Sequence, residues 1–211
     1  MKNNKKKYAL LIILILFIAF FSSQCMMTHT NTGSKKTVAV ILPYTYNKEN
    51  SRILDAIRDY AYNNSIILDV WHEKSLSSNE LSSIIANEEQ NHAIGILLIY
   101  PENYLTQQEK HYDYNNVLAI TDTMQSSFSH HASFETSPSP SYPLPVSAWV
   151  IKKVHEGKTD CIYIKNTYKL GYESIQMLDT YSRNKHMKDI SIPCQKVNKA
   201  AIESGELDAL L

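Results

Sequence analysis

The sequence has 211 residues, of which 44% are hydrophobic and 20% are charged, and this balance excludes a disordered, collagen-like or coiled-coil chain. Lys and Arg together number 21, as do Asp and Glu. Residues 1–25 hold four lysines and no acidic residue, so the remainder carries 17 basic and 21 acidic side chains. This mildly acidic body lacks the basic stripe that nucleic-acid binding requires, and we expect no nucleic-acid partner.

Residues 1–27 are typical of a signal peptide or a membrane anchor. Four lysines precede an apolar run of 14 residues, Tyr8 to Phe21, which is the order found in export signals. A helix over this run is about 21 Å long, shorter than the ~30 Å hydrocarbon core of a bilayer, although Met26 and Met27 could extend it into an uncleaved hydrophobic helix. The lysines favour the cytoplasmic side, which places the body on the outer, extracytoplasmic face of the cell membrane.

Cys25 follows the apolar run after three polar residues, at the place where a lipoprotein has its acylated cysteine. The preceding Ser22-Ser23-Gln24 departs from the residues that usually stand there. Lipidation of Cys25, an uncleaved helix and plain secretion therefore stay open as alternatives. The polar residues 28–35 predict a short flexible tether.

Four short apolar segments alternate with segments of helical period in the body of the chain. Nearly continuous apolar runs of this kind are typical of parallel strands that are covered on both faces. The predicted strands are residues 36–42, 65–71, 92–100 and 116–121. Their alternation with helices predicts an α/β fold, a three-layer αβα sandwich with a mainly parallel sheet, over residues 36–211.

The first two connecting segments carry clear helix signals. An apolar stripe begins after Asn47 and predicts the first helix. Ser77 and Glu80 have capping-box spacing and predict the start of the second helix. A weaker helix is expected over about 104–113.

Residues 123–147 interrupt this pattern. They are rich in serine and contain four of the seven prolines, and proline at alternate positions blocks both helices and central strands. We expect an exposed, partly extended loop. Beyond it the pattern predicts helices over 148–157 and 167–183, a fifth strand at 160–165 and a final extended piece at 190–197.

Three segments, 35–70, 91–123 and 155–178, together resemble the type I periplasmic-binding-protein fold of ribose- and galactose-type sugar-binding proteins and of lactose-repressor-type regulatory domains. The last of them, HEGKTDCIYIKNTYKLGYESIQML, is similar to the family's late turn, strand, crossover and helix, with Thr167 in place of the usual proline. Members of this family are longer. The resemblance therefore implies a single lobe preceded by an N-terminal hydrophobic helix, with residues 123–147 in place of most of the second lobe.

Ligands of open α/β sheets bind outside the carboxyl ends of the strands. Sugar sites combine aromatic rings with planar polar groups, and the strand-end loops offer Tyr44, Tyr46, Asn47, Glu102 and Asp122. By resemblance, the loop after the first strand and the aspartate after the fourth contact the ligand, and Asn166 and Tyr168 at the last crossover join them. Alternatively, these are ordinary loop residues in a lobe that binds nothing, because one lobe cannot enclose a small ligand.

The sequence favours no enzyme. It contains no nucleophile elbow, phosphate-binding loop or dinucleotide fingerprint, and its eight histidines show no metal-ligand spacing. The adjacent His130 and His131 would point apart in an extended chain, so we expect neither a metal nor a cofactor. Cys161 and Cys194 fall in predicted strands, as buried thiols or as a disulfide.

These observations lead to a hypothesis for function. The chain is expected to be a membrane-tethered solute-binding protein with a small, sugar-like ligand, working with the permease of an ABC transporter or with a sensor kinase. The alternative is a ligand-free protein-interaction module or a degenerate remnant of such a protein.

Overall fold

The computed structural model describes residues 35–45, 47–106, 111–122, 126–135 and 148–204. Its contacts divide the chain into residues 1–35 and 36–211, and the account below concerns the second unit. The hydrophobic helix expected in residues 1–27 lies outside the described residues. Within the described ranges, none of the helices combines the length and the apolar character needed to cross a bilayer.

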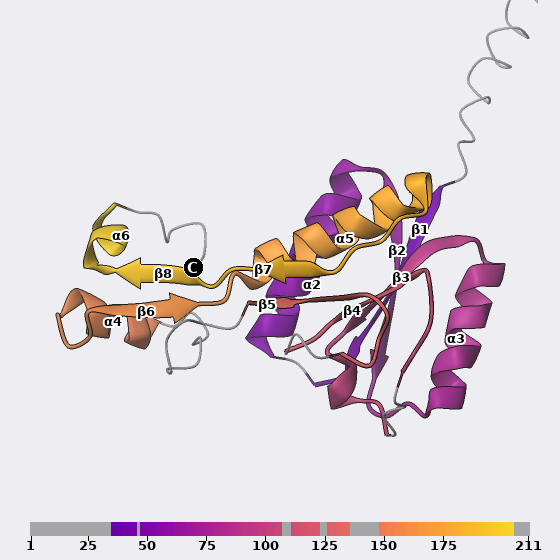
Figure 1. The fold of residues 1–211 in the computed structure, drawn as a ribbon, viewed down its shortest axis with the longest axis horizontal. Helices are drawn as coiled ribbons and strands as arrows, with labels where there is room; N and C mark the ends of the chain where they lie inside the picture. Colours follow the sequence, from indigo (N-terminus) through magenta and orange to yellow (C-terminus); the bar gives the residue numbers. More distant parts are fainter. Residues whose placement is uncertain (1–34, 46, 107–110, 123–125, 136–147, 205–211) are drawn as a thin grey trace, which may run out of the picture. The chain divides into compact units, whose positions relative to one another are not determined.

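A six-stranded sheet forms the centre of this unit (Figure 1). All of its neighbouring strands are parallel, in the order β2-β1-β3-β4-β5-β7. The strands are β1 (Lys36–Pro43), β2 (Ile66–Glu73), β3 (Ala93–Ile99), β4 (Val117–Ile120), β5 (His131–Phe134) and β7 (Ile190–Ile192). The predicted α/β class with a mainly parallel sheet is confirmed.

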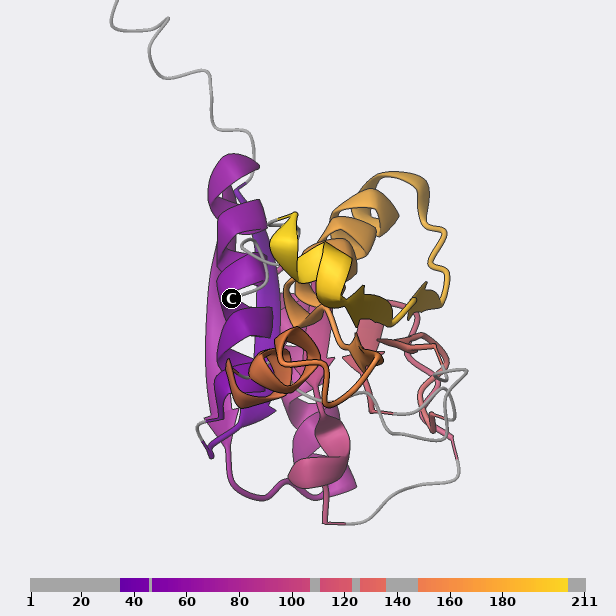
Figure 2. The ribbon, with the colours of Figure 1, turned by 90° about the vertical axis from the view of Figure 1, so that its left-hand side faces the viewer.

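Helices cover both faces of the sheet. Helices α2 (Lys48–Asn63) and α5 (Thr167–Asn184) share one apolar core with Val38 and Val40 of β1, whereas α3 (Ser78–Gln90) packs with Ala39 on the other face. The alternation follows from the pleat of a strand, in which successive side chains point to opposite faces. The turned view in Figure 2 shows α2 running beside β1.

The predicted helix starts are confirmed in atomic detail. Asn47 caps α2, its Oδ1 accepting a hydrogen bond from the Asn50 backbone N–H at 2.7 Å. Ser77 and Glu80 form the complete capping box of α3. Each cap satisfies backbone donors that the first turn of a helix leaves unpaired.

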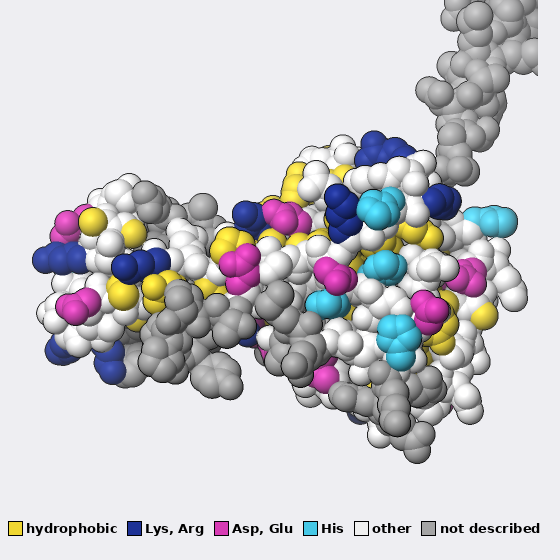
Figure 3. All heavy atoms as spheres, viewed as in Figure 1, with side chains coloured by type: hydrophobic (Ala, Val, Ile, Leu, Met, Phe, Trp, Pro, Cys, Tyr) yellow, Lys and Arg dark blue, Asp and Glu magenta, His cyan; other side chains and the backbone are white. Residues whose placement is uncertain are grey.

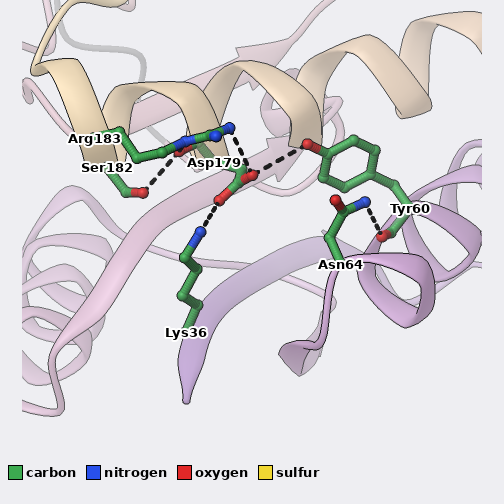
Figure 4. Close-up of polar contacts among 6 residues, drawn as sticks. All are labelled: Lys36, Tyr60, Asn64, Asp179, Ser182 and Arg183. Atoms are coloured by element: carbon green, nitrogen blue, oxygen red, sulfur yellow. Dashed lines mark hydrogen bonds and ion pairs between the residues drawn. The ribbon is translucent and has the colours of Figure 1, made fainter. Parts of the chain in front are cut away.

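A buried carboxylate ties the beginning of the sheet to the late helix α5 (Figure 4). Asp179 accepts hydrogen bonds from Lys36 Nζ at 2.6 Å, Arg183 Nη2 at 3.0 Å and the Tyr60 hydroxyl at 3.2 Å. Burial alone would raise the pKa of Asp179, but these three donors outweigh it and hold the pKa below its usual range. Burial and the neighbouring Asp179 carboxylate raise the pKa of Tyr60 to about 12.

A second, small sheet stands outside the parallel one (Figure 1). Strand β6 (Cys161–Ile164) pairs with β8 (Gln195–Asn198) in antiparallel orientation. Helices α4 (Ala148–His155) and α6 (Lys199–Glu203) flank it, and a separate core forms around Val154, Ile162, Ile164 and Val197. The fifth strand expected at 160–165 therefore exists, but it does not join the parallel sheet.

Two local expectations differ from the structure. Residues 131–134 form the buried strand β5 inside the segment expected to be a loop, while the four prolines of that segment lie outside the described residues. Residues 104–106 are not helical, because Leu76 pairs with them: its N–H donates to Tyr104 O at 2.7 Å, and its carbonyl accepts from Thr106 N at 2.9 Å.

Candidate functional site

Polar side chains from separate segments meet at the carboxyl edge of the parallel sheet. Glu49 lies in the first turn of α2, just after β1, and Glu102 lies in the short 3-10 helix η1 (Pro101–Asn103) after β3. Asp122 follows β4. The carboxyl ends of neighbouring parallel strands share one edge, so these three carboxylates are brought together by topology alone.

Lys165 is the centre of this group. It lies in the crossover between β6 and α5, and its Nζ is 3.1 Å from Asp122 Oδ1 and 4.0 Å from Glu49 Oε1. The same ammonium sits 5.3 Å from the ring centroid of Phe134, at the end of β5. Only 18% of the Lys165 side chain is exposed. We call Lys165, Glu49, Glu102, Asp122 and Phe134 the strand-end cluster.

Tyr100 lies next to the strand-end cluster and bonds to one of its members, and Glu102 bonds to another. The Tyr100 hydroxyl donates to Glu49 Oε1 at 3.2 Å, and burial followed by the charge of Glu49 raises the pKa of Tyr100 far above its ordinary value. Glu102 Oε1 accepts from the Asp122 backbone N–H at 3.3 Å. Desolvation raises the pKa of Glu102, although the backbone hydrogen bonds to its carboxylate oppose this. Tyr100 thus stays a neutral donor beside carboxylates that can accept hydrogen bonds from a ligand.

The structure separates the residues singled out from sequence. Glu102 and Asp122 lie in the strand-end cluster. Tyr44 and Asn47 line a different cavity, between α2 and the ends of β1 and β2. Tyr46 lies outside the described residues.

The two residues expected at the last crossover make contacts of their own. Asn166 is next to Lys165, but its Oδ1 caps α5 by accepting from the Lys169 backbone N–H at 2.9 Å. The Tyr168 hydroxyl donates to Asp59 Oδ2 on α2 at 2.7 Å, and 39% of this residue is exposed. Sequence reasoning missed three members of the strand-end cluster, Lys165, Glu49 and Phe134. The signal for Lys165 was a charged residue ending an otherwise apolar strand.

The described histidines and cysteines form no second site. Several histidine side chains lie on the face shown in Figure 3. Among the histidines, His131 Nδ1 lies 3.3 Å from Asp189 Oδ1, and His111 Nε2 lies 3.3 Å from Ser129 Oγ. Within the part of the chain that the structure describes, no group of three or more potential ligands could hold a metal ion. Cys161 and Cys194 are half-buried free thiols rather than a disulfide.

Comparisons with known proteins identify the fold. No family model and no curated protein sequence matches this chain. Among solved structures, it is similar to a periplasmic ribose ABC transporter protein from Conexibacter woesei DSM 14684, with a TM-score of 0.51, 9% identity and coverage of 84% of this chain and 97% of the other. It is also similar to a mutant form of the XylFII–LytSN complex, with a TM-score of 0.51, 8% identity and coverage of 79% of this chain and 99% of the other.

The trehalose repressor from Escherichia coli is similar to the same extent, with a TM-score of 0.50, 8% identity and coverage of 78% of this chain and 100% of the other. None of the three is described as an enzyme. Identities this low establish the fold. The chain has the type I periplasmic-binding-protein fold, and in the described residues the six-stranded sheet with its helices corresponds to a single lobe of that fold.

Proposed function

We propose that this chain is an extracytoplasmic solute-binding protein, and that its ligand is a small, sugar-like molecule held at the strand-end cluster. The convergence on Lys165 carries the proposal. Hydroxyl groups of such a ligand would donate to the carboxylates of Asp122 and Glu49 and accept from the Lys165 ammonium. The buried Phe134 ring, whose centroid is 5.3 Å from Lys165 Nζ, would hold the ammonium in place beside such a ligand.

The segments that cross between the two sheets would transmit ligand binding from the strand-end cluster to the second sheet. The chain passes between the two sheets three times, after Phe134, at Lys165-Asn166 and at Pro193-Cys194. We call the six-stranded sheet with α2, α3 and α5 the main unit. Lys165 contacts Asp122 of the main unit directly, and Cys194 Sγ lies 3.6 Å from the Glu135 carbonyl oxygen. A ligand that engages Lys165 would therefore bias the second crossover, which is where hinge motions of such folds are absorbed.

We further propose that residues 1–27 hold the protein at the outer face of the cell membrane, with 28–35 as a tether, where it serves a transporter permease or a sensor kinase. The order of lysines, apolar run and Cys25 supports this placement. Mass spectrometry of the mature N-terminus distinguishes an acylated Cys25 from a retained helix and from plain cleavage. A full-length, unmodified N-terminus recovered from the soluble fraction would contradict the proposed tether.

One observation favours a second candidate, a ligand-free interaction module. The second sheet has two strands among the described residues, whereas small-ligand sites bury most of the ligand surface. In that case Lys165 would serve only to pair with Asp122 and Glu49 inside the strand-end cluster, which would bind no solute.

A binding titration separates the two candidates. The full-length chain, purified in mild detergent, is titrated with D-ribose, D-xylose and D-galactose by calorimetry and thermal shift. A sugar present at 100 times its Kd should add about 2.7 kcal/mol of stability. Asp122→Asn and Lys165→Met should each weaken that sugar, while Glu203→Gln, on the exposed end of α6, should not. Absence of any saturable binding would favour the interaction module.

A further inference from the structure

Four basic side chains lie at the amino edge of the parallel sheet, where its strands begin. They are Lys36 at the start of β1, Arg183 and Lys185 at the end of α5, and Lys188 before β7. We call these four residues the basic patch. In the view of Figure 3, Lys and Arg side chains lie over the end of α5 and the beginning of β1. The strand-end cluster lies at the other end of the same strands.

The buried carboxylate beneath the basic patch neutralises only part of its charge. The side chains of Lys36 and Arg183 are 38% and 61% exposed, and they share the single carboxylate of Asp179. These three residues therefore keep one positive charge together. Lys185 and Lys188 are exposed and each adds another.

Three further acidic side chains limit the extent of this positive surface. Asp189 follows the basic patch in the chain, and its carboxylate lies 3.3 Å from His131 Nδ1. Glu89 and Asp113 line the same hollow of about 570 Å³ as Lys185. The positive charge is therefore confined to the end of α5 and the start of β1, and it does not extend across the hollow.

The opposite edge of the sheet carries more acidic than basic side chains. Among the described residues, its carboxylates are Glu49, Glu73, Glu102, Asp122 and Glu135, and its lysines are Lys48, Lys74 and Lys165. This difference between the two edges gives the main unit a preferred orientation at a negatively charged surface. The basic patch turns toward such a surface and the strand-end cluster turns away from it.

The proposed tether ends at the basic patch. Residues 28–35 span at most about 29 Å when they are fully extended, and Lys36 follows them directly. A membrane that holds residues 1–27 is therefore within reach of the basic patch. The eight residues of β1 place the strand-end cluster about 26 Å farther along the strand.

We propose that the basic patch docks onto the phosphate groups of anionic lipids in the membrane that holds the tether. The inference rests on the proposed tether and adds the surface by which the main unit faces the bilayer. In this orientation the strand-end cluster opens away from the bilayer, toward the solute. Each lysine near an anionic surface raises the ratio of docked to undocked protein about fivefold, and salt screens this attraction.

The test uses the full-length chain in nanodiscs of two compositions, phosphatidylcholine alone and equal parts of phosphatidylcholine and phosphatidylglycerol. Hydrogen exchange, read by mass spectrometry, is followed in a peptide over 183–189 and in a reference peptide over 101–106 at the opposite edge. We expect exchange of 183–189 to slow only with phosphatidylglycerol and to recover in high salt, while 101–106 stays unchanged. In Lys185→Gln/Lys188→Gln the ratio of docked to undocked protein should fall about 25-fold.

The matched control removes two lysines from the flank of the second sheet. Lys152 and Lys199, whose side chains are 71% and 60% exposed, lie on α4 and α6. Lys152→Gln/Lys199→Gln changes the net charge of the chain by the same amount. It should leave the exchange of 183–189 as slow as in wild type, because these lysines lie outside the basic patch.

Each other outcome contradicts the docking or the tether. Equal exchange of 183–189 in the two kinds of nanodisc would overturn the docking, even where a variant fails to fold, and would leave the tether standing if the chain enters both kinds. Slow exchange that persists in Lys185→Gln/Lys188→Gln, or that appears at 101–106 instead, would also overturn the docking. A chain that binds only membranes with phosphatidylglycerol, and only with both lysines intact, would sustain the basic patch and contradict the tether.

Discussion

Replacing Asp179 with asparagine is expected to remove a large share of the stability of residues 36–211. The carboxylate is 4% exposed and holds Lys36, Arg183 and the Tyr60 hydroxyl (Figure 4). Breaking a fully buried ion pair costs about 3–5 kcal/mol. The side chains of Lys36 and Arg183 are 38% and 61% exposed, so water can partly replace the lost carboxylate, and we expect a loss of about 2 kcal/mol.

The assay is urea unfolding of the full-length chain in detergent, followed by tryptophan fluorescence. The exposed pair Asp55–Arg58, 3.4 Å apart, supplies the control, since Asp55→Asn should change stability by less than about 0.5 kcal/mol. If Asp179→Asn unfolds at the same urea concentration as wild type and as Asp55→Asn, Asp179 does not tie β1, α2 and α5 together.

The same variant has a defined dependence on pH. An unfolded aspartate titrates near ~3.9, and the pKa of folded Asp179 lies lower. Its stabilisation is therefore complete above the unfolded pKa and is lost as the pH falls through the folded pKa. The difference between wild type and Asp179→Asn should be constant from about pH 7 to 5 and narrow below about pH 4.

Three further substitutions test a buried charge, a close approach and a helix cap. Glu88→Gln should stabilise the folded protein by about 1 kcal/mol at pH 7, because burial and the nearby Asp69 raise the pKa of Glu88. The urea midpoints of variant and wild type should converge as the pH falls and the wild-type carboxyl protonates, and a destabilised variant would contradict this. Gly171→Ala should cost about 1–3 kcal/mol, since a Cβ there would lie 2.5 Å from the Ile53 carbonyl oxygen; an unchanged thermal midpoint would be inconsistent with that close approach. Ser77→Ala should cost about 1 kcal/mol by loss of its cap, measured by urea unfolding, and no loss would mean that the capping box contributes nothing.

Local signals in the sequence were sufficient for α2, α3, α4, α5 and the first four strands, but they gave a helix at 104–113 that residues 104–106 do not form, and they did not indicate α6. Caps at Asn47 and Ser77 act over three residues, so they are visible without knowledge of the fold. Strand β5 was missed because its four residues, HASF, include polar His131 and Ser133 in a serine-rich stretch. Its burial comes from pairing with β4 and β7, which are non-local partners.

Which sheet a strand joins and which residues meet at the site both depend on contacts between residues far apart in the chain. The pattern of residues 161–164 predicts a strand, but only its antiparallel pairing with β8 assigns it to the second sheet. The strand-end rule correctly brought Glu102 and Asp122 to one edge. It could not identify Lys165, whose place beside Asp122 depends on how the crossover returns to the main unit.

The order of segments interleaves the two sheets, because β6 precedes α5 and β7 whereas its partner β8 follows them. Helix α5 and strand β7 come after β6 in the chain, yet Leu170 and Ile175 of α5 pack in the same core as Val38 of β1. The bond between Lys36 and Asp179 spans 143 residues, so the main unit closes only after the chain has returned from the second sheet. Contacts that distant form late and slowly in folding. The two sheets are nevertheless separate in hydrogen bonding, because the six parallel strands pair with one another and β6 pairs with β8.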